Sequence, residues 1–317
     1  LDDISLFSSV DDFLPPVIAG AELINENTVR IAYSEPMDLA SVTDPMNYTT
    51  NAAIETITYT EPGGSDFPYV DVQYTEPFVD GQGYSISPGL VTDVAGNFLL
   101  EAFTFDWVYN NTVPNLVITE ILYNTPGQDI LEFIEIYNAG TEAAALGGLT
   151  VSSEFSFTFP ELTLQPGGIT LLALNEAEAE AFFGQDFLDW GFDDLTNGDE
   201  VILIRNFSGQ LIDSVNYLDE APWPTEADGN GPSIELIDPA LDNADGSNWF
   251  ANTNNLPDSD IAATPGVYNP IVLPVVSFEE ETITVDEAAG TISLNLQITN
   301  ANANQAEAFL NVVSAST

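Results

Sequence analysis

The sequence predicts an all-β protein made of tandem β-sandwiches, with one short helix near residues 175–183. Apolar and polar residues alternate with a period of two through many short runs, which is typical of strands with one buried face. Clusters of Gly, Pro, Asn and Asp separate these runs and predict turns. With 317 residues, 44% of them hydrophobic, the chain is long and apolar enough for two or three domains with cores of their own.

The first full domain is expected over residues 15–111. Val29, Ile31 and Tyr33 alternate with Thr28, Arg30 and Ala32, which predicts a half-buried strand. The same alternation recurs in three later runs, 70–74, 84–86 and 103–107. Turn clusters separate these strands at 34–36, 61–66, 80–83 and 93–97. Many short strands with regular turns favour a β-sandwich.

Four motifs of this domain occur together in one known family. They are Ala32–Met37, Asn47-Tyr48, Tyr84–Ser87 and Asp93–Asn97. In this order they resemble the bacterial Ig-like domain of S-layer and other surface proteins, which implies an Ig-like sandwich. In that family the last motif is a tight loop, in which Gly96 would supply a positive φ and Asp93 an Asx-type turn. We therefore expect a structural role for this loop.

The second domain is expected over residues 112–269. Its predicted strands are 116–123, interrupted by Glu120, then 133–138, 155–159, 169–174, and a hairpin formed by 201–205 and 211–217. The only helix signal of the chain lies in this domain. Asn175 is a capping residue, acidic residues follow in the first turn, and Gly184 is a typical helix end.

A second family resemblance covers this domain, from about residue 113 to 269. It rests on Thr119–Ile121, Phe133–Asn138, Leu146–Leu149, Asn197–Asp199 and the closing stretch Asp228–Asn269. Together these segments resemble the bacterial lamin-tail domain, a secreted Ig-like sandwich. The chain departs from the family at Thr119, where Asn is usual, and at Leu149, where an aromatic residue is usual. The resemblance implies that Asn248 and Trp249 tie down the closing loop.

Both ends of the chain indicate a piece of a longer protein. Residues 1–14 are interpreted as the tail of a preceding domain and a linker. Residues 270–317 contain three strand-like runs that resemble the first strands of a Calx-β domain, and this resemblance implies that Glu287 is a Ca²⁺ ligand. About 45 residues are too few to bury a stable core alone, so we expect the chain to continue.

Charge is the strongest feature of the composition. There are 51 Asp and Glu residues against two cations, Arg30 and Arg205, and the formal net charge is -49. Self-repulsion at this density opposes compaction, so salt or bound divalent cations must offset it. Ca²⁺ prefers carboxylate and carbonyl oxygens and is the natural candidate. General acidity of a surface protein adapted to salt, without any specific site, is the open alternative.

The same composition excludes several classes of partner and chemistry. Nucleic acids and anionic lipid surfaces require clusters of Lys and Arg, which are absent. No run of about 18 apolar residues predicts a membrane span. The chain has no Cys, His or Lys, so disulfides, thiolate catalysis, imidazole bases and Schiff-base lysines are excluded. No convincing active site is present, and we expect no enzyme.

Three groups of acidic residues are candidate Ca²⁺ sites. The first is an acidic loop whose spacing fits no EF-hand and which contains Asp186, Asp189, Asp193, Asp194, Asp199 and Glu200. The second is the closing loop with Asp238, Asp242 and Asp245. The third is Glu120 with Glu135, on strands expected to pair, where backbone donors are the alternative to a metal. A solvated acidic loop is the alternative for the first group, and structural use of Asn and Trp in the closing loop is the alternative for the second.

These observations favour a non-catalytic structural or adhesive segment, a stalk or fibre, of a large secreted bacterial cell-surface protein, stabilised by Ca²⁺. The expected partners are neighbouring domains of the same chain, with a homo-oligomer or fibre and surface glycans as further options. The alternative is a carbohydrate-binding accessory module of a secreted hydrolase. Of the four tryptophans, only Trp190 is a surface candidate for stacking on a sugar, because the others fall on core faces or structural motifs.

Overall fold

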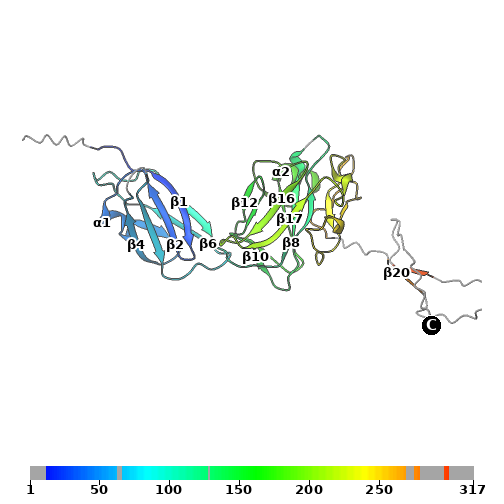
Figure 1. The fold of residues 1–317 in the computed structure, drawn as a ribbon. Helices are drawn as coiled ribbons and strands as arrows, with labels where there is room; N and C mark the ends of the chain where they lie inside the picture. The colour runs from blue at the N-terminus through cyan, green and yellow to red at the C-terminus, as the bar shows by residue number, and fades with distance from the viewer. Residues whose placement is uncertain (1–11, 63–65, 128, 269–274, 279–295, 300–317) are drawn as a thin grey trace, which may run out of the picture. The chain divides into compact units, whose positions relative to one another are not determined.

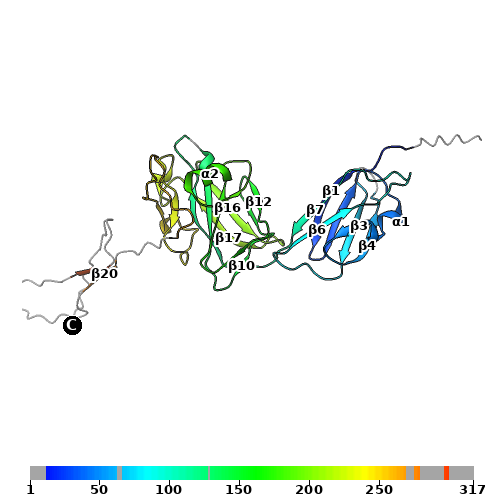
Figure 2. The ribbon, with the colours of Figure 1, turned by 180° about the vertical axis from the view of Figure 1, so that it is seen from behind.

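A computed structural model describes residues 12–62, 66–127, 129–268, 275–278 and 296–299 (Figures 1 and 2). The chain divides into two units, Leu1–Tyr268 and Asn269–Thr317, which are described separately. The first unit contains two sandwiches, each with its own buried core. The all-β prediction is therefore confirmed.

Two antiparallel sheets form the first sandwich. The four-stranded sheet has the order β1-β2-β5-β4, with β1 Ile18–Asn25, β2 Thr28–Tyr33, β5 Tyr69–Tyr74 and β4 Ile54–Thr60. The three-stranded sheet has the order β3-β6-β7, with β3 Tyr48–Thr50, β6 Gly83–Pro88 and β7 Phe105–Val108. Val29, Ile31 and Tyr33 are fully buried between the sheets, as their alternation predicts.

The single-helix prediction is wrong for the first sandwich, which contains one further helical turn, α1 Leu39–Val42. Asp38 nucleates this turn, because its side chain accepts a hydrogen bond from the backbone N–H of Ser41 at 2.8 Å. A 3₁₀ turn, η1 Pro45–Asn47, follows directly. The Asp93 loop forms as expected: Asp93 Oδ1 accepts from the N–H of Ala95, and Gly96 has φ of 90°.

The second sandwich packs a six-stranded sheet against a four-stranded one. The six-stranded order is β15-β14-β9-β8-β18-β19, with β15 Leu188–Asp189, β14 Ile169–Ala173, β9 Phe133–Asn138, β8 Leu116–Leu122, β18 Ile234–Leu236 and β19 Trp249–Ala251. The four-stranded order is β12-β11-β16-β17, with β12 Ser156–Thr158, β11 Thr150–Ser152, β16 Glu200–Arg205 and β17 Leu211–Tyr217. A small pair, β10 Ala144–Ala145 and β13 Thr163–Leu164, completes the fold.

The six-stranded sheet is buried on both faces. Its inner face packs on the four-stranded sheet through residues such as Ile118, Ile134 and Ile136. Its outer face packs through a separate cluster that includes Phe133, the helix α2 Glu176–Phe183, and Ile261 of the closing stretch. The predicted helix is confirmed: Asn175 caps it on the N–H of Glu178, and Gly184 ends it in the left-handed conformation. The remaining 3₁₀ turns are η2 Asp129–Leu131, η3 Thr225–Ala227 and η4 Gly246–Asn248.

A register shift between Ile118 and Glu120 interrupts the pairing of β8 with β9. Ile118 and Ile121 both belong to the inner core, so the two residues between them, Thr119 and Glu120, fall outside the simple alternation. Leu122 then packs in the outer cluster. The shift places two consecutive polar side chains on the outer side of this strand.

In the second unit the structure describes two antiparallel strands, β20 Val275–Phe278 and β21 Leu296–Thr299. They overlap two of the three runs predicted to be strands in residues 270–317. Glu287, the implied Ca²⁺ ligand, lies outside the described residues. Across the described part of the chain, no helix has the length and apolar character needed to span a membrane.

Candidate functional site: buried carboxylates

Three glutamates form a row across the centre of the six-stranded sheet. In the strand register Glu120 lies opposite Glu135 on one side and opposite Glu235 on the other. Their relative exposures are only 1%, 2% and 4%. The expected approach of Glu120 and Glu135 is therefore confirmed, and Glu235 joins them. We call these residues the glutamate row.

Segments on either side of β18 supply hydrogen bonds to two members of the row. Glu120 Oε1 accepts from Ser233 Oγ at 2.5 Å and from the N–H of Thr264 at 2.9 Å. Glu235 Oε2 accepts from Asn252 Nδ2 at 2.8 Å and from Thr264 Oγ1 at 3.1 Å. Thr264 therefore bridges two carboxyl groups, and the closing stretch is fastened to the sheet through them.

The third member is held from both sides. Glu135 Oε1 accepts from Thr119 Oγ1 at 2.7 Å, and Glu135 Oε2 accepts from the N–H of Gly266 at 2.8 Å. Thr119 reaches this carboxyl because the register shift turns it outward beside Glu120. Both oxygens of Glu135 therefore accept hydrogen bonds, one from a hydroxyl group and one from the backbone.

Burial is the largest cause of the raised pKa values of the three glutamates. It raises the pKa of Glu120 well above the usual range, and the charge of Glu135 adds to the effect. Burial likewise raises the pKa of Glu135, and it raises the pKa of Glu235 to about 7. The row is therefore able to take up protons near neutral pH, which relieves the repulsion between its members.

A different pair of buried glutamates lies at the acidic loop. Glu200 is fully satisfied: Oε1 accepts from Ser153 Oγ, and Oε2 accepts from the N–H of Thr196 and from Tyr217 Oη at 3.0 Å. Glu132 has 0% exposure, and its Oε2 accepts from the N–H of Leu195 at 2.7 Å. The other oxygen, Oε1, is enclosed without a hydrogen-bond partner in the described structure.

The five aspartates of the acidic loop are spread out. Asp189 accepts from the N–H of Gly191 at 2.6 Å, Asp193 adopts a positive φ of 70°, and the carbonyl of Asp199 accepts from Thr196 Oγ1. Asp186 lines a pocket on the edge of β14, and Asp194 is exposed beside Leu195. No three of these five carboxylates, all of them within the described residues, have ligand oxygens within 4.8 Å of one another.

Trp190, the expected surface tryptophan, is a core residue. Its exposure is 5%, and its ring stacks on Phe155 with a centroid distance of 4.5 Å. Its indole N–H donates to the carbonyl of Asp193 at 3.1 Å. The surface prediction is wrong because the loop folds the ring inward between the sheets. The other tryptophans are buried as expected, at 7%, 4% and 4% exposure.

The aspartates of the closing loop form turns. Asp238, Asp242 and Asp245 each accept a hydrogen bond from the backbone N–H two residues later, at 2.9 to 3.0 Å. Asn248 Nδ2 donates to the carbonyl of Asp242, and Trp249 Nε1 donates to that of Asn243. The expected tying role of Asn248 and Trp249 is confirmed.

One group of carboxylates that sequence reasoning missed lies in the first sandwich. Within the described residues, Asp12, Glu35 and Asp93 are the one set of three acids with ligand oxygens within 4.8 Å of one another. Asp93 is already occupied by the N–H groups of its own loop and by Asn97 Nδ2 at 2.8 Å. These residues come from three distant parts of the sequence, so spacing provides no signal for them.

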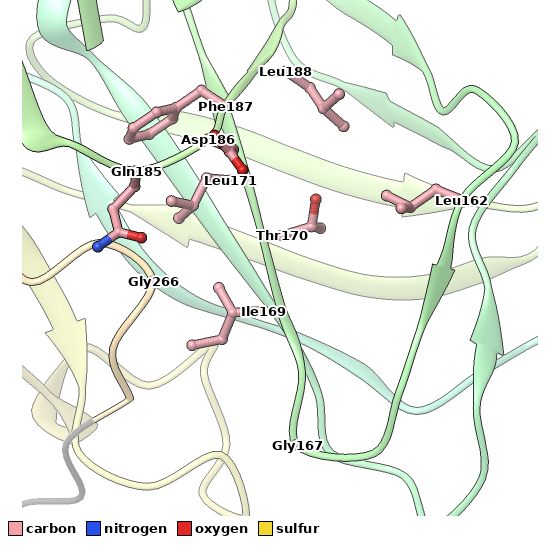
Figure 3. A pocket seen from close by; sticks show the side chains of 10 residues that line it. All are labelled: Leu162, Gly167, Ile169, Thr170, Leu171, Gln185, Asp186, Phe187, Leu188 and Gly266. Atoms are coloured by element: carbon pink, nitrogen blue, oxygen red, sulfur yellow. The ribbon is translucent and has the colours of Figure 1, made fainter. Parts of the chain in front are cut away.

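The pocket on β14 has a volume of about 440 Å³ (Figure 3). Its lining is mixed, with Ile169 and Leu171 on the strand, Phe187 above them, and the polar side chains of Thr170, Gln185 and Asp186. Asp186 is the one ionisable side chain of its lining, so the pocket does not hold a pair of catalytic carboxylates.

Comparisons with known proteins agree with part of this picture. Residues 110–219 match the family model described as Lamin Tail Domain. The match confirms the lamin-tail resemblance for these residues and ends before β18, so it does not include the closing stretch. No curated protein matches the sequence.

Two of the solved structures that match this chain do so at low identity and low TM-score. The N-terminal part of the bacterial S-layer protein SbsC is 13% identical, with a TM-score of 0.28, over 65% of this chain and 44% of that chain. A DUF4876 family protein from Bacteroides thetaiotaomicron is 11% identical, with a TM-score of 0.35, over 69% of this chain and 95% of that chain. This chain thus spans less than half of the SbsC structure, and at such TM-scores neither likeness carries a functional argument.

Proposed function

We propose that this chain is a non-catalytic structural segment of a large secreted bacterial surface protein, in which the two sandwiches act as a rigid spacer. The observation that carries the proposal is the junction between them. Phe207, in the β16–β17 turn of the second sandwich, packs against the core cluster of the first. Its ring lies 5.0 Å from that of Tyr109.

Buried amides reinforce this junction. Asn110 has 0% exposure, and its Nδ2 donates to the carbonyls of Ala145 at 2.7 Å and Gly147 at 2.9 Å. Asn206 has 3% exposure, and its Nδ2 donates to the carbonyl of Asn111 at 3.1 Å. A flexible linker would leave such groups in water, so the contacts support a fixed connection.

A structural role also agrees with the chemistry of the chain. The described pocket offers a single carboxylate, and the sequence has no Cys, His or Lys. Each tryptophan is buried, so no observation favours the carbohydrate-binding alternative. The partners that we propose are neighbouring domains of the same extracellular chain.

The rigid-spacer proposal is tested by spin labels on this cysteine-free chain. Glu55→Cys and Asn216→Cys place one exposed label in each sandwich. We expect a narrow distance distribution by pulsed electron resonance, which Phe207→Ala broadens. Phe192→Ala, at a phenylalanine that is 88% exposed, is the matched control and should change nothing. A broad distribution in the doubly labelled parent would refute the rigid spacer.

We further propose that divalent cations stabilise the segment, because a formal charge of -49 opposes folding. Ca²⁺ is the expected ion, since oxygen ligands predominate. Thermal unfolding in EGTA and in excess Ca²⁺, at one ionic strength, tests this. We expect a higher midpoint in Ca²⁺, whereas identical midpoints would leave only salt screening.

A further inference from the structure

Glu132 has a buried oxygen that the protein leaves without a partner. The residue follows η2 and precedes β9, and its side chain is fully enclosed. Oε2 is held by the N–H of Leu195, which fixes the carboxyl group against the acidic loop. Oε1 has no hydrogen-bond partner in the described structure. A buried polar atom in this state points to a missing ligand.

The surroundings of this oxygen are negative. Asp129, Asp194 and Glu200 all lie near enough for their negative charges to act on Glu132. Neither arginine compensates for them: Arg30 pairs with Asp71, and Arg205 donates to the carbonyl of Gly209. A cation from solution is therefore the ligand that this electrostatic environment favours.

Three hydrogen bonds fix the conformation of the 190–196 loop beside Glu132. Trp190 anchors it through the carbonyl of Asp193, and the N–H groups of Leu195 and Thr196 bind Glu132 and Glu200. The segment between these anchors carries Asp194, exposed and next to the residue that holds Glu132. Asp194 is also near enough to Glu132 for its charge to act on that carboxyl group.

We propose that Glu132, with Asp194 and main-chain oxygens of the 190–196 loop, binds one divalent cation, with Ca²⁺ as the fitting ion. This assignment rests on the cation-stabilised function proposed above and names one site for it. Ca²⁺ suits the site because it accepts irregular sets of carboxylate, carbonyl and water oxygens. Zinc is disfavoured because the chain has neither His nor Cys.

Terbium is the probe for this site, because an ion held there would be excited through the indole of Trp190. We expect saturable terbium luminescence in the full chain that Ca²⁺ displaces. Glu132→Gln, which keeps the shape of the side chain, should weaken the affinity by at least the roughly tenfold that loss of even an outer-shell partner causes. Asp194→Asn, in the exposed loop, is a second variant that does not depend on a buried substitution.

Glu120→Gln is the matched control, since Glu120 is equally buried but already has donors of its own in Ser233 and Thr264. It should bind terbium like the parent. Circular dichroism verifies that each variant is folded, and calorimetry measures Ca²⁺ binding without relying on the indole of Trp190. Equal terbium affinity in the parent, Glu132→Gln and Asp194→Asn would overturn the site. A buried water would then be the ligand of Oε1.

The melting experiment separates this site from the wider proposal. If Ca²⁺ raises the unfolding midpoint of Glu132→Gln and Asp194→Asn as much as that of the parent, the site is wrong and cation stabilisation stands. If Ca²⁺ changes none of the midpoints and terbium does not bind, both proposals fail. The site is supported if Ca²⁺ no longer raises the unfolding midpoint of Glu132→Gln and Asp194→Asn but still raises that of Glu120→Gln.

Discussion

Individual buried carboxyl groups decide how this protein responds to pH. Glu235 is 4% exposed and keeps Asn252 and Thr264 as hydrogen-bond donors. Glu120 lies opposite it on the adjacent strand, and the charge of Glu135, one strand further along, also raises its pKa. No cation lies in this row among the described ion pairs. The buried glutamates of the row therefore reduce their charge by binding protons.

Glu235→Gln should make folding stability less dependent on pH. The pKa of Glu235 is about 7 in the folded protein, against about 4.3 when unfolded. Between these values the folded state binds the extra proton, so its contribution is complete below the unfolded pKa and is lost as pH rises towards 7. Between the two pKa values, Glu235 makes the unfolding free energy decrease as pH rises, by up to about 1.4 kcal/mol per pH unit. The variant should lack this decrease.

Denaturant unfolding at several pH values between those two pKa values measures this slope. The control is Glu55→Gln, an exposed glutamate on β4, which should leave the slope unchanged. A Glu235→Gln variant with the slope of the parent would show that this carboxyl stays ionised when the protein folds.

Among the elements, the closing stretch around and after β18 has the most demanding geometry. Gly231 has φ of 106°, and its carbonyl accepts from the N–H of Ala262 at 3.1 Å. A Cβ at this position would overlap the backbone carbonyl of Asp260. The two backbone segments approach so closely that only glycine fits.

Gly231→Ala should therefore lower the unfolding free energy by about 3 kcal/mol or more, through both the positive φ and the overlap. Gly184→Ala separates these two causes. Gly184 also has a positive φ, of 71°, but nothing lies within 4 Å of the position that a Cβ would occupy there. We expect a loss of about 1 kcal/mol in this variant. Equal losses in the two variants, from urea unfolding, would contradict the close approach.

At the scale of the whole molecule, the dominant electrostatic feature is the excess of negative charge, which few ion pairs offset. The described ion pairs involve only Arg30, which contacts Asp71 at 2.8 Å and Glu22 at 4.0 Å. Nearly all of the 51 acidic residues therefore lack a cationic side chain. Their mutual repulsion is long-ranged at low salt and screened at high salt.

Salt should stabilise this protein strongly. The Debye length falls from about 30 Å at 0.01 M to about 3 Å at 1 M ionic strength, so repulsion between surface carboxylates nearly disappears. We expect the thermal midpoint to rise steadily with NaCl, and with KCl to the same extent. A midpoint that does not change over this range would show that the acidic groups are already neutralised by bound ions or protons.

Short-range pattern predicts much of the fold. The alternation at Val29 to Tyr33, the helix between Asn175 and Gly184, and the Asp93 turn all depend on neighbours within a few residues. The pairing of Glu120 with Glu135 also follows from two adjacent strands. The turn α1 at Leu39 escapes prediction because one capping contact from Asp38 decides it.

Long-range packing decides the rest. The register shift in β8 turns Thr119 and Glu120 to the same side, and the fold then buries Trp190 and encloses Glu132. The Asp12, Glu35 and Asp93 group is assembled from segments far apart in the chain. The sequence by itself thus predicts that the acidic residues need cations or protons to offset their charge. Which carboxyl groups bind them depends on burial, and burial is created by residues that are distant in sequence.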